Sequence, residues 1–196
     1  MQIHSSAEVS PSARIGQDVS IWHFTRVREG VSIGNQVNVG ANVYIGPSVT
    51  IGNQCKIQNG AQIYEPAILE DGVFIGPSVI LTNDHNPRSI NSDLTLKSDQ
   101  DWEKVGVVVC RGASIGAGAI CVAPIRIGAW SMIAAGSVVI SDTLDYSLMA
   151  GVPAKQIGWV GESGVSLQNL EGTRWRCPKT GSLYEVSTTG TLVKSK

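Results

Sequence analysis

The sequence predicts an all-β protein built as a coil of short parallel strands, and three observations predict it. Aliphatic residues recur at every sixth position, turn-forming residues recur between them, and 22 of the 196 residues are glycine while only 6% are aromatic. A period of six fits neither the 3.6-residue repeat of a helix nor the alternation of an ordinary strand. It fits a chain that makes one short strand and one corner per repeat, so that three repeats complete one turn of a triangular prism.

The repeat runs from Ile3 to Leu81 in steps of six, and starts again in a new frame from Val109 to Val139. Of these 20 positions, 19 hold Ile, Val or Leu, and the remaining one holds Cys121. We expect these side chains to point inward and to stack from coil to coil, with Gly, Asn and Asp at the corners. Twenty repeats predict a little under seven coils, about 32 Å tall at roughly 4.8 Å per coil.

The repeat is lost between the two runs, over residues 87–108, which are rich in Ser, Asn, Asp and Lys. We therefore expect an exposed excursion loop there. Long excursions from a regular solenoid are usually functional. The first domain that we expect is a β-helix over residues 1–162 that carries this loop.

The repeat is lost a second time in the C-terminal tail, residues 163–196. Residues 182–186 and 191–193 alternate in polarity, and Thr189-Gly190 lies between them. This pattern predicts a small hairpin.

Composition and charge argue against several classes of function. The net charge is −1 and no run of Lys or Arg occurs, which disfavours binding to nucleic acid. No stretch of 18 apolar residues and no signal peptide are visible, so we expect neither a membrane span nor export. The four cysteines form no Cys-x-x-Cys pair, which favours a reduced, cytoplasmic protein without a zinc site.

Two segments near the end of the repeat resemble the closing signature of hexapeptide acyltransferases that use coenzyme A. They are Ile-Ala-Ala-Gly-Ser-Val-Val at residues 133–139 and Gly-Val-Pro-Ala-Lys at residues 151–155. In that family, backbone amides of the last coils hold the pantetheine arm, and a basic residue lies near the nucleotide phosphates. The alternative is that the small residues only permit the coils to stack and that the proline only ends them.

Most of the chain looks like the nucleotide-sugar 3-N-acetyltransferases of bacterial polysaccharide assembly. The nearest likeness is to the enzymes that acetylate UDP-2-acetamido-3-amino-2,3-dideoxy-glucuronate (the WbpD/WlbB type). The matching segments are residues 21–24, 56–59, 63–65, 69–74, 81–89, 151–159 and 177–181. The resemblance implies a left-handed parallel β-helix, a homotrimer with active sites between subunits, acetyl-CoA as co-substrate, and a role in surface polysaccharide or lipopolysaccharide O-antigen biosynthesis.

Two residues just before the excursion are the catalytic candidates. Asn83 matches a family position that touches the sugar near the reacting amine, and an amide there can orient the nucleophile. His85 departs from these relatives, which carry a non-ionisable residue at that position. In other hexapeptide acetyltransferases a histidine beside the excursion is the general base, a role that suits imidazole near neutral pH. The alternative is that His85 only ends the inward stack.

The resemblance also implies two binding sets. The residues expected to face the nucleotide sugar are Gln58, Asn59, Tyr64, Glu65, Asp84 and Arg88. The residues expected to bind acetyl-CoA are Gly116, Ala117, Gly118, Ala134, Ala135, Gly136, Pro153 and Lys155. Arg88 could hold a sugar carboxylate or a diphosphate oxygen through its forked guanidinium, and Lys155 could face the phosphates of the coenzyme.

Hexapeptide prisms also have other functions, which are alternatives to the N-acetyltransferase hypothesis. A zinc carbonic anhydrase needs three histidine ligands at one interface, and His4, His23 and His85 lack the close spacing of such sites. No metal is therefore expected. A second acyltransferase hypothesis moves the acceptor to a dTDP-linked deoxyamino sugar or to a sugar hydroxyl. A hypothesis of another class is a non-catalytic trimeric scaffold, which would not need polar groups at the base of the excursion.

Overall fold

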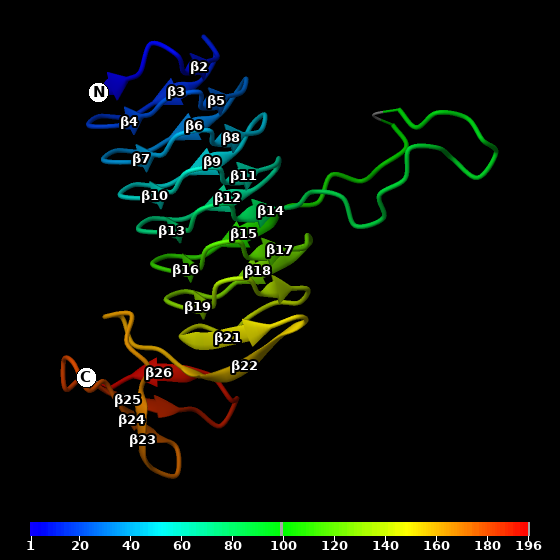
Figure 1. Cartoon of the computed structure of the whole chain (residues 1–196). Coiled ribbons are helices and arrows are strands. Elements are labelled where there is room, and N and C mark those ends of the chain that lie inside the picture. The colour runs from blue at the N-terminus through cyan, green and yellow to red at the C-terminus, as the bar shows by residue number, and fades with distance from the viewer. Residues whose placement is uncertain (99, 196) are drawn as a thin grey trace.

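The computed structural model describes residues 1–98 and 100–195, so Asp99 of the excursion and Lys196 lie outside the described residues. It shows a left-handed parallel β-helix with three sheets along its sides, a projecting arm and a small C-terminal sheet (Figure 1). The predicted fold is confirmed. Each six-residue repeat forms one strand, and each strand ends at a corner of the prism.

The strands of the three sides are short, and we name the sides sheets A, B and C. Sheet A contains β1 (Gln2–Ile3), β4 (Ser20–Ile21), β7 (Asn38–Val39), β10 (Lys56–Ile57), β13 (Phe74–Ile75), β16 (Ser114–Ile115), β19 (Met132–Ile133), β21 (Ser147–Gly151) and β22 (Ala154–Trp159). Sheet B contains β2 (Glu8–Val9), β5 (Arg26–Val27), β8 (Tyr44–Ile45), β11 (Gln62–Ile63), β14 (Ile80–Leu81), β17 (Ile120–Cys121) and β20 (Val138–Val139). Sheet C contains β3 (Arg14–Ile15), β6 (Ser32–Ile33), β9 (Thr50–Ile51), β12 (Ile68–Leu69), β15 (Val107–Val109) and β18 (Ile125–Ile127).

The register of the sheets follows from the coil length. Ile3 lies opposite Ile21, 18 residues later, and this offset recurs from coil to coil. Where the excursion intervenes the offset grows to 40, as between Ile75 and Ile115, so the excursion adds 22 residues to one coil. The inward side chains therefore stay aligned on both sides of it.

The core is a column of aliphatic side chains inside the prism. Ile63 and Ile75 are fully buried, and the same holds for their equivalents in neighbouring coils. Cys121 occupies one of these inward positions, and burial raises the pKa of its thiol to about 12. It is thus a small core residue, as the sequence predicts.

One parallel strand, β21, does not follow the six-residue repeat. β21 pairs with β19 and places Met149 opposite Ile133, which continues the inward column of sheet A. Val139 and Met149 are ten residues apart, because the chain first passes through Thr143, whose amide bonds to the carbonyl of Arg126 at 2.9 Å. The period of six therefore fails at this coil although the stacking continues.

The excursion leaves the prism after β14 and returns at β15, and it projects sideways as an arm (Figure 1). Val107 and Val108 belong to β15, so the loop ends two residues earlier than the sequence predicted. Val107 pairs with Ile125 and is fully buried, which returns these residues to the sheet. Leu94 and Leu96 on the arm are 78% and 80% exposed.

The tail is larger than the predicted hairpin. β22 runs antiparallel to β21 and leads into an antiparallel sheet of β23 (Gln168–Glu171), β24 (Arg174–Arg176), β25 (Leu183–Val186) and β26 (Leu192–Lys194). The pair β25–β26 is the predicted hairpin, whereas β23 and β24 were missed because they show no clear apolar alternation. The sheet has its own core of Trp159, Leu167, Cys177, Tyr184 and Leu192.

The part of the chain that the structure describes holds no helix with the length and apolar character needed to cross a bilayer.

Candidate functional site

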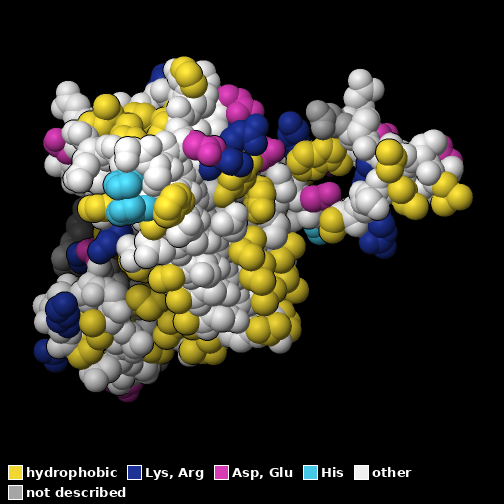
Figure 2. Space-filling model, turned by 45° about the horizontal axis from the view of Figure 1, so that its top comes forward, with side chains coloured by type: hydrophobic (Ala, Val, Ile, Leu, Met, Phe, Trp, Pro, Cys, Tyr) yellow, Lys and Arg dark blue, Asp and Glu magenta, His cyan; other side chains and the backbone are white. Residues whose placement is uncertain are grey.

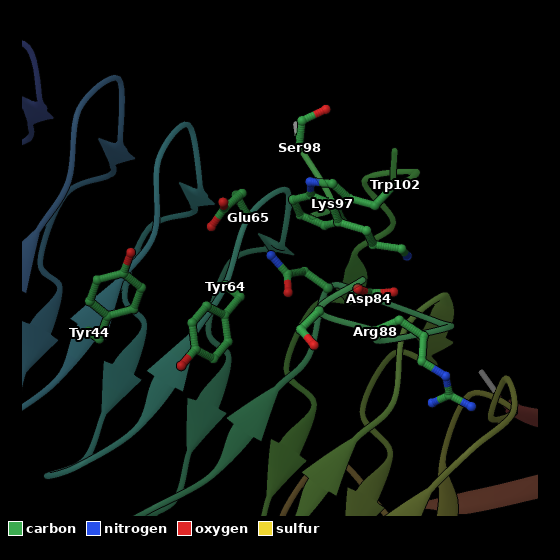
Figure 3. Close-up of a pocket in the computed structure, with 10 residues that line it drawn as sticks. Tyr44, Tyr64, Glu65, Asp84, Arg88, Lys97, Ser98 and Trp102 are labelled. Atoms are coloured by element: carbon green, nitrogen blue, oxygen red, sulfur yellow. The ribbon is translucent and has the colours of Figure 1, made fainter. Parts of the chain in front are cut away.

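A depression of about 510 Å³ lies where the excursion leaves the prism, and we call it the Asn83 pocket. It is lined by Tyr44, Tyr64, Glu65, Asn83, Asp84, Arg88, Ser89, Lys97, Ser98 and Trp102. The first three residues come from the coils and the others from the excursion. Figure 3 shows the two tyrosines on one side and Lys97, Ser98 and Trp102 on the other.

One wall of the Asn83 pocket is formed by coil residues, whose positions are set by the strands that they belong to or follow. Tyr44 is the outward residue of β8, and Tyr64 and Glu65 follow β11 at the corner. The rings of Tyr44 and Tyr64 lie 5.4 Å apart between centroids and are tilted by 49°. Strand register fixes these positions, so the wall is as rigid as the prism.

His85 lies in a neighbouring depression of about 310 Å³, which we call the His85 pocket. Asp84, Lys97 and Trp102 line both pockets, so the two depressions share a boundary. Asn83 faces one of them and His85 the other. The two catalytic candidates therefore both lie at the base of the excursion but line adjoining depressions.

The imidazole of His85 is oriented by the coil beneath it. Its Nδ1 lies 3.3 Å from the carbonyl oxygen of Ala123, so Nδ1 carries the proton and donates it to that oxygen. Nε2 then keeps a free lone pair that can accept a proton. Ala123 is also held through its amide, whose hydrogen the Thr82 hydroxyl accepts at 2.9 Å. The arrangement suits a general base.

Arg88 lines the rim of the Asn83 pocket, but its guanidinium points away from Tyr44 and Tyr64 (Figure 3). Its Nη1 donates to the carbonyl of Pro87 at 3.1 Å. Its expected contact with a carboxylate or a diphosphate stays a prediction.

Gln58 and Asn59 lie apart from the other predicted sugar-binding residues. They follow β10 at the corner of sheet A, in a depression of about 340 Å³ that Trp22, His23 and Lys56 also line. The Asn59 Oδ1 accepts the amide of Ala41 at 2.9 Å, which closes the corner of the preceding coil. Within one chain, the structure does not bring this pair together with Tyr64 and Glu65.

Six of the eight predicted coenzyme residues share one corner of the prism. Residues 116–118 follow β16 and residues 134–136 follow β19, so the two segments occupy the same corner of successive coils. Gly136 donates its amide to the carbonyl of Ala117 at 2.8 Å and has a φ of 70°, which favours glycine. Pro153 and Lys155 are exposed near the turn between β21 and β22.

Two amides at this corner are open to a ligand. Among the described residues none accepts a hydrogen bond from the amide of Ala117 or Ala135, and both residues are exposed. In an earlier coil Asn59 accepts the equivalent amide of Ala41. Ala135 stands where Asn59 stands and has no side-chain acceptor, so the amide of Ala117 stays free. Such amides fit the amide-rich pantetheine arm of coenzyme A.

Five residues of the Asn83 pocket were not among the site residues predicted from the sequence: Tyr44, Ser89, Lys97, Ser98 and Trp102. Tyr44 could have been found, because β8 and β11 pair with Tyr44 opposite Gln62, two residues before Tyr64. An 18-residue coil therefore predicts that the rings are neighbours. Lys97 and Trp102 lie in the excursion, where no register exists to place them.

No cluster of three or more His, Cys, Asp or Glu side chains that could hold a metal ion occurs among residues 1–98 and 100–195.

The repeats match known families. The family described as bacterial transferase hexapeptide (six repeats) matches residues 12–47 and 48–83, and the hexapeptide repeat of succinyl-transferase matches residues 30–65. Residues 12–83 are therefore hexapeptide repeats of the bacterial transferase type.

Two curated proteins are similar to part of the chain. Serine acetyltransferase 4 of Arabidopsis thaliana is 46% identical over 56 residues, which are 29% of this chain and 16% of that protein. The dTDP-3-amino-3,6-dideoxy-alpha-D-galactopyranose 3-N-acetyltransferase of Aneurinibacillus thermoaerophilus is 49% identical over 53 residues, 27% of this chain and 28% of that protein. The matched part covers less than a third of either relative.

Solved structures share the fold over most of the chain. The acetyltransferase domain of PglB from Neisseria gonorrhoeae matches with a TM-score of 0.51 and 23% identity, over 79% of this chain and 56% of that one. A variant of AntD, an N-acyltransferase from Bacillus cereus solved with dTDP and coenzyme A, matches with a TM-score of 0.50 and 21% identity. The match covers 80% of this chain and 79% of that one. At these identities the likeness concerns the fold.

Proposed function

We propose, on the premise that residues 12–83 carry the hexapeptide repeats of bacterial transferases, that this protein transfers an acetyl group from acetyl-CoA to an amino group of a nucleotide-linked sugar. The observation that carries the proposal is that Asn83 and an oriented His85 line two adjoining depressions at the base of the excursion, of about 510 and 310 Å³. A scaffold would not need this convergence of polar groups. Both curated relatives are named as acetyltransferases, and one of them is named for a dTDP-linked amino sugar.

The proposed roles follow from the geometry of the chain's own groups. Acetyl-CoA, when bound, supplies a thioester carbonyl that an amine can attack. The amine nitrogen bonds to that carbonyl carbon, the carbon–sulfur bond breaks, and the Asn83 amide orients the amine. His85, held at Nδ1 by the Ala123 carbonyl, accepts the amine proton at Nε2 and returns it to the departing thiolate, so that the coenzyme leaves as a thiol. Backbone amides at residues 116–118 are the candidate donors to the carbonyl oxygen. Tyr64 and Glu65 contact the sugar.

A homotrimer with sites between subunits is part of the proposal. The open amides follow sheet A and the Asn83 pocket follows sheet B, so they lie on different edges of one prism. If a second copy contacts the projecting arm, the edge of one subunit that carries the Asn83 pocket can lie beside the edge of the other that carries the open amides. The exposure of Leu94 and Leu96 on the arm supports such a contact. Light scattering on the purified protein tests the trimer.

The substrate proposed first is UDP-2-acetamido-3-amino-2,3-dideoxy-glucuronate, in surface polysaccharide or O-antigen biosynthesis. The similarity of residues in the repeat to a dTDP-amino-sugar acetyltransferase favours a dTDP-linked sugar as the second candidate. All four cysteines are free thiols, which supports a reducing compartment such as the cytoplasm.

The test is thiol release from acetyl-CoA with a panel of UDP- and dTDP-linked amino sugars. Turnover with the 3-amino uronate alone supports the first substrate, and turnover with only a dTDP sugar moves the acceptor but keeps the activity. Asn83→Ala should lower the rate about a hundredfold or more with little change in Tm or assembly. If no sugar of the panel leads to thiol release and the protein does not bind coenzyme A, the non-catalytic scaffold is favoured.

A further inference from the structure

Two arginines extend the Asn83 pocket toward the N-terminal coils. Arg26 lies on β5 directly opposite Tyr44 on β8, and Arg28 follows β5 at the corner where Tyr64 follows β11. The Arg28 Nη1 donates to the Tyr44 hydroxyl at 3.2 Å, and Tyr44 lines the Asn83 pocket. One side chain therefore connects the guanidinium to the pocket.

The arginines line a depression of their own, with a volume of about 410 Å³. Glu8 and Glu29 line it as well, so the site combines two positive and two negative side chains. Figure 2 shows basic and acidic side chains gathered on the face of the prism near the root of the arm.

Within the part of the chain that the structure describes, Arg26 has nitrogens without a partner, whereas each nitrogen of Arg28 already donates one hydrogen bond. The Arg26 Nε donates to Glu8 at 2.7 Å, while its two terminal nitrogens have no hydrogen-bond partner among the described residues. The Arg28 Nε and Nη2 donate to Glu29 at 2.8 and 3.0 Å. Both ion pairs are exposed, with the Arg28 side chain 41% and the Glu29 side chain 55% accessible. Exposed pairs of this kind contribute little, so a phosphate group with a higher charge can replace the carboxylate.

The shape of a nucleotide sugar fits this arrangement. Its diphosphate is attached at C1 of the sugar and the reacting amine at another ring carbon, so the diphosphate must lie beside the reacting centre. The excursion and His85 lie on the C-terminal side of Tyr64, and Arg28 lies on its N-terminal side. Arg88, the arginine that the sequence suggested, points away from the tyrosines (Figure 3).

We propose that Arg28, with Arg26 beside it, binds the diphosphate of the substrate, and that Tyr44 links this subsite to the sugar pocket. The inference rests on the proposed function in one respect, namely that the substrate is linked to a nucleoside diphosphate. A forked guanidinium matches two phosphate oxygens, and the Tyr44 hydroxyl, which accepts from Arg28, can donate its own hydrogen to a third.

The test is calorimetric binding of UDP and dTDP to the full chain, with uridine and thymidine as probes that lack phosphate. Arg28→Gln should weaken the tighter-binding diphosphate about ten- to a hundredfold and leave the binding of its nucleoside unchanged. Arg28→Lys, which keeps the charge but loses the fork, should fall between. Arg14→Gln on sheet C is the matched control, since Arg14 is also an exposed strand residue but lines none of these depressions, and it should bind as the wild type does.

Equal affinity of the wild type and Arg28→Gln for the diphosphate would overturn the inference, as would failure of the wild type to bind either diphosphate. The proposed function fails separately. Binding that depends on Arg28 without any thiol release would keep the subsite and reject the acetyl transfer. Thiol release with an unchanged KM for the nucleotide sugar in Arg28→Gln would keep the acetyl transfer and reject the diphosphate subsite.

Discussion

The coils and the excursion are built on opposite principles. In the coils a residue has an equivalent 18 positions away, and Val39, Ile57 and Ile75 stack in one column with the same role. In the excursion no residue has such an equivalent, and its contacts are made within the loop or with the prism at its base. The two pockets with the catalytic candidates lie at the junction between these regions.

The difference teaches that departures from the repeat indicate chemistry more clearly than the repeat does. The same holds inside the coils. The corner after sheet C closes its amides with a ladder in which Asn35, Asn53 and Asp71 each accept the amide of the preceding coil at 2.7–2.9 Å. The corner after sheet A has Ala117 and Ala135 at that position and leaves their amides open. Four predictions test this division.

The largest effect is expected from His85→Asn. The change removes the Nε2 lone pair but touches no repeat position, so the rate should fall about 10²- to 10⁴-fold while Tm stays within a few degrees. The loss should extend across the pH optimum of acetyl transfer. A loss confined to low pH would contradict the role of His85 as the base.

The converse change is Ile75→Ala in the fully buried column. Removing these methyl groups leaves a cavity between Ile57 and Ile115, and the free energy of unfolding should fall by about 2–5 kcal/mol in a denaturant titration. The activity per folded molecule should stay near that of the wild type. A large drop in kcat at low temperature would show that the column also shapes the site.

Restoring the repeat at the open corner should weaken the coenzyme. In Ala135→Asn the new side chain can accept the amide of Ala117, as Asn59 accepts that of Ala41 at 2.9 Å. We expect a KM for acetyl-CoA that rises about five- to tenfold, the value of one lost hydrogen bond, with an equal or higher Tm. Ala135→Leu has a similar volume and no acceptor. An equal rise in both variants would mean that bulk alone is responsible.

The smallest effect concerns the tail and high pH. Burial, and after it the nearby Glu162 carboxylate, raises the pKa of Tyr146 to about 12, and Tyr146 packs against Tyr184 of the C-terminal sheet at 5.5 Å. Unfolded tyrosine titrates near pH 10, so the stabilisation is complete below about pH 10 and is lost as the pH rises through the folded value. Tryptophan fluorescence of Trp159 and Trp175 should report loosening in this range.

Tyr146→Phe is the matched control for this prediction. The variant keeps the ring but has no proton to lose, so its tail should respond less to pH between about 10 and 12. An identical response in both proteins would assign the alkaline sensitivity to other groups.

How far the sequence predicts the site depends on the region. Tyr64 and Glu65 lie at a corner of a coil, and both line the Asn83 pocket. Their place could be predicted because the regular six-residue repeat fixes the corner at which each residue lies. Gln58 and Asn59 were grouped with them from the resemblance, yet one chain holds them on another corner. Lys97 and Trp102 were not assigned to the site because loop residues are placed by contacts that have no spacing rule.

The prism, its inward column and the place where an excursion interrupts it follow from the sequence, because coils of equal length stack through local spacing alone. The sequence also places Asn83 and His85 at the base of that excursion. Three features follow only from the folded structure: the Ala123 carbonyl orients His85, Tyr44 joins Arg28 to the sugar pocket, and Arg88 turns away from the tyrosines. The first two contacts join residues that are 38 and 16 positions apart, where the direction of a side chain depends on its neighbours in space rather than on the period.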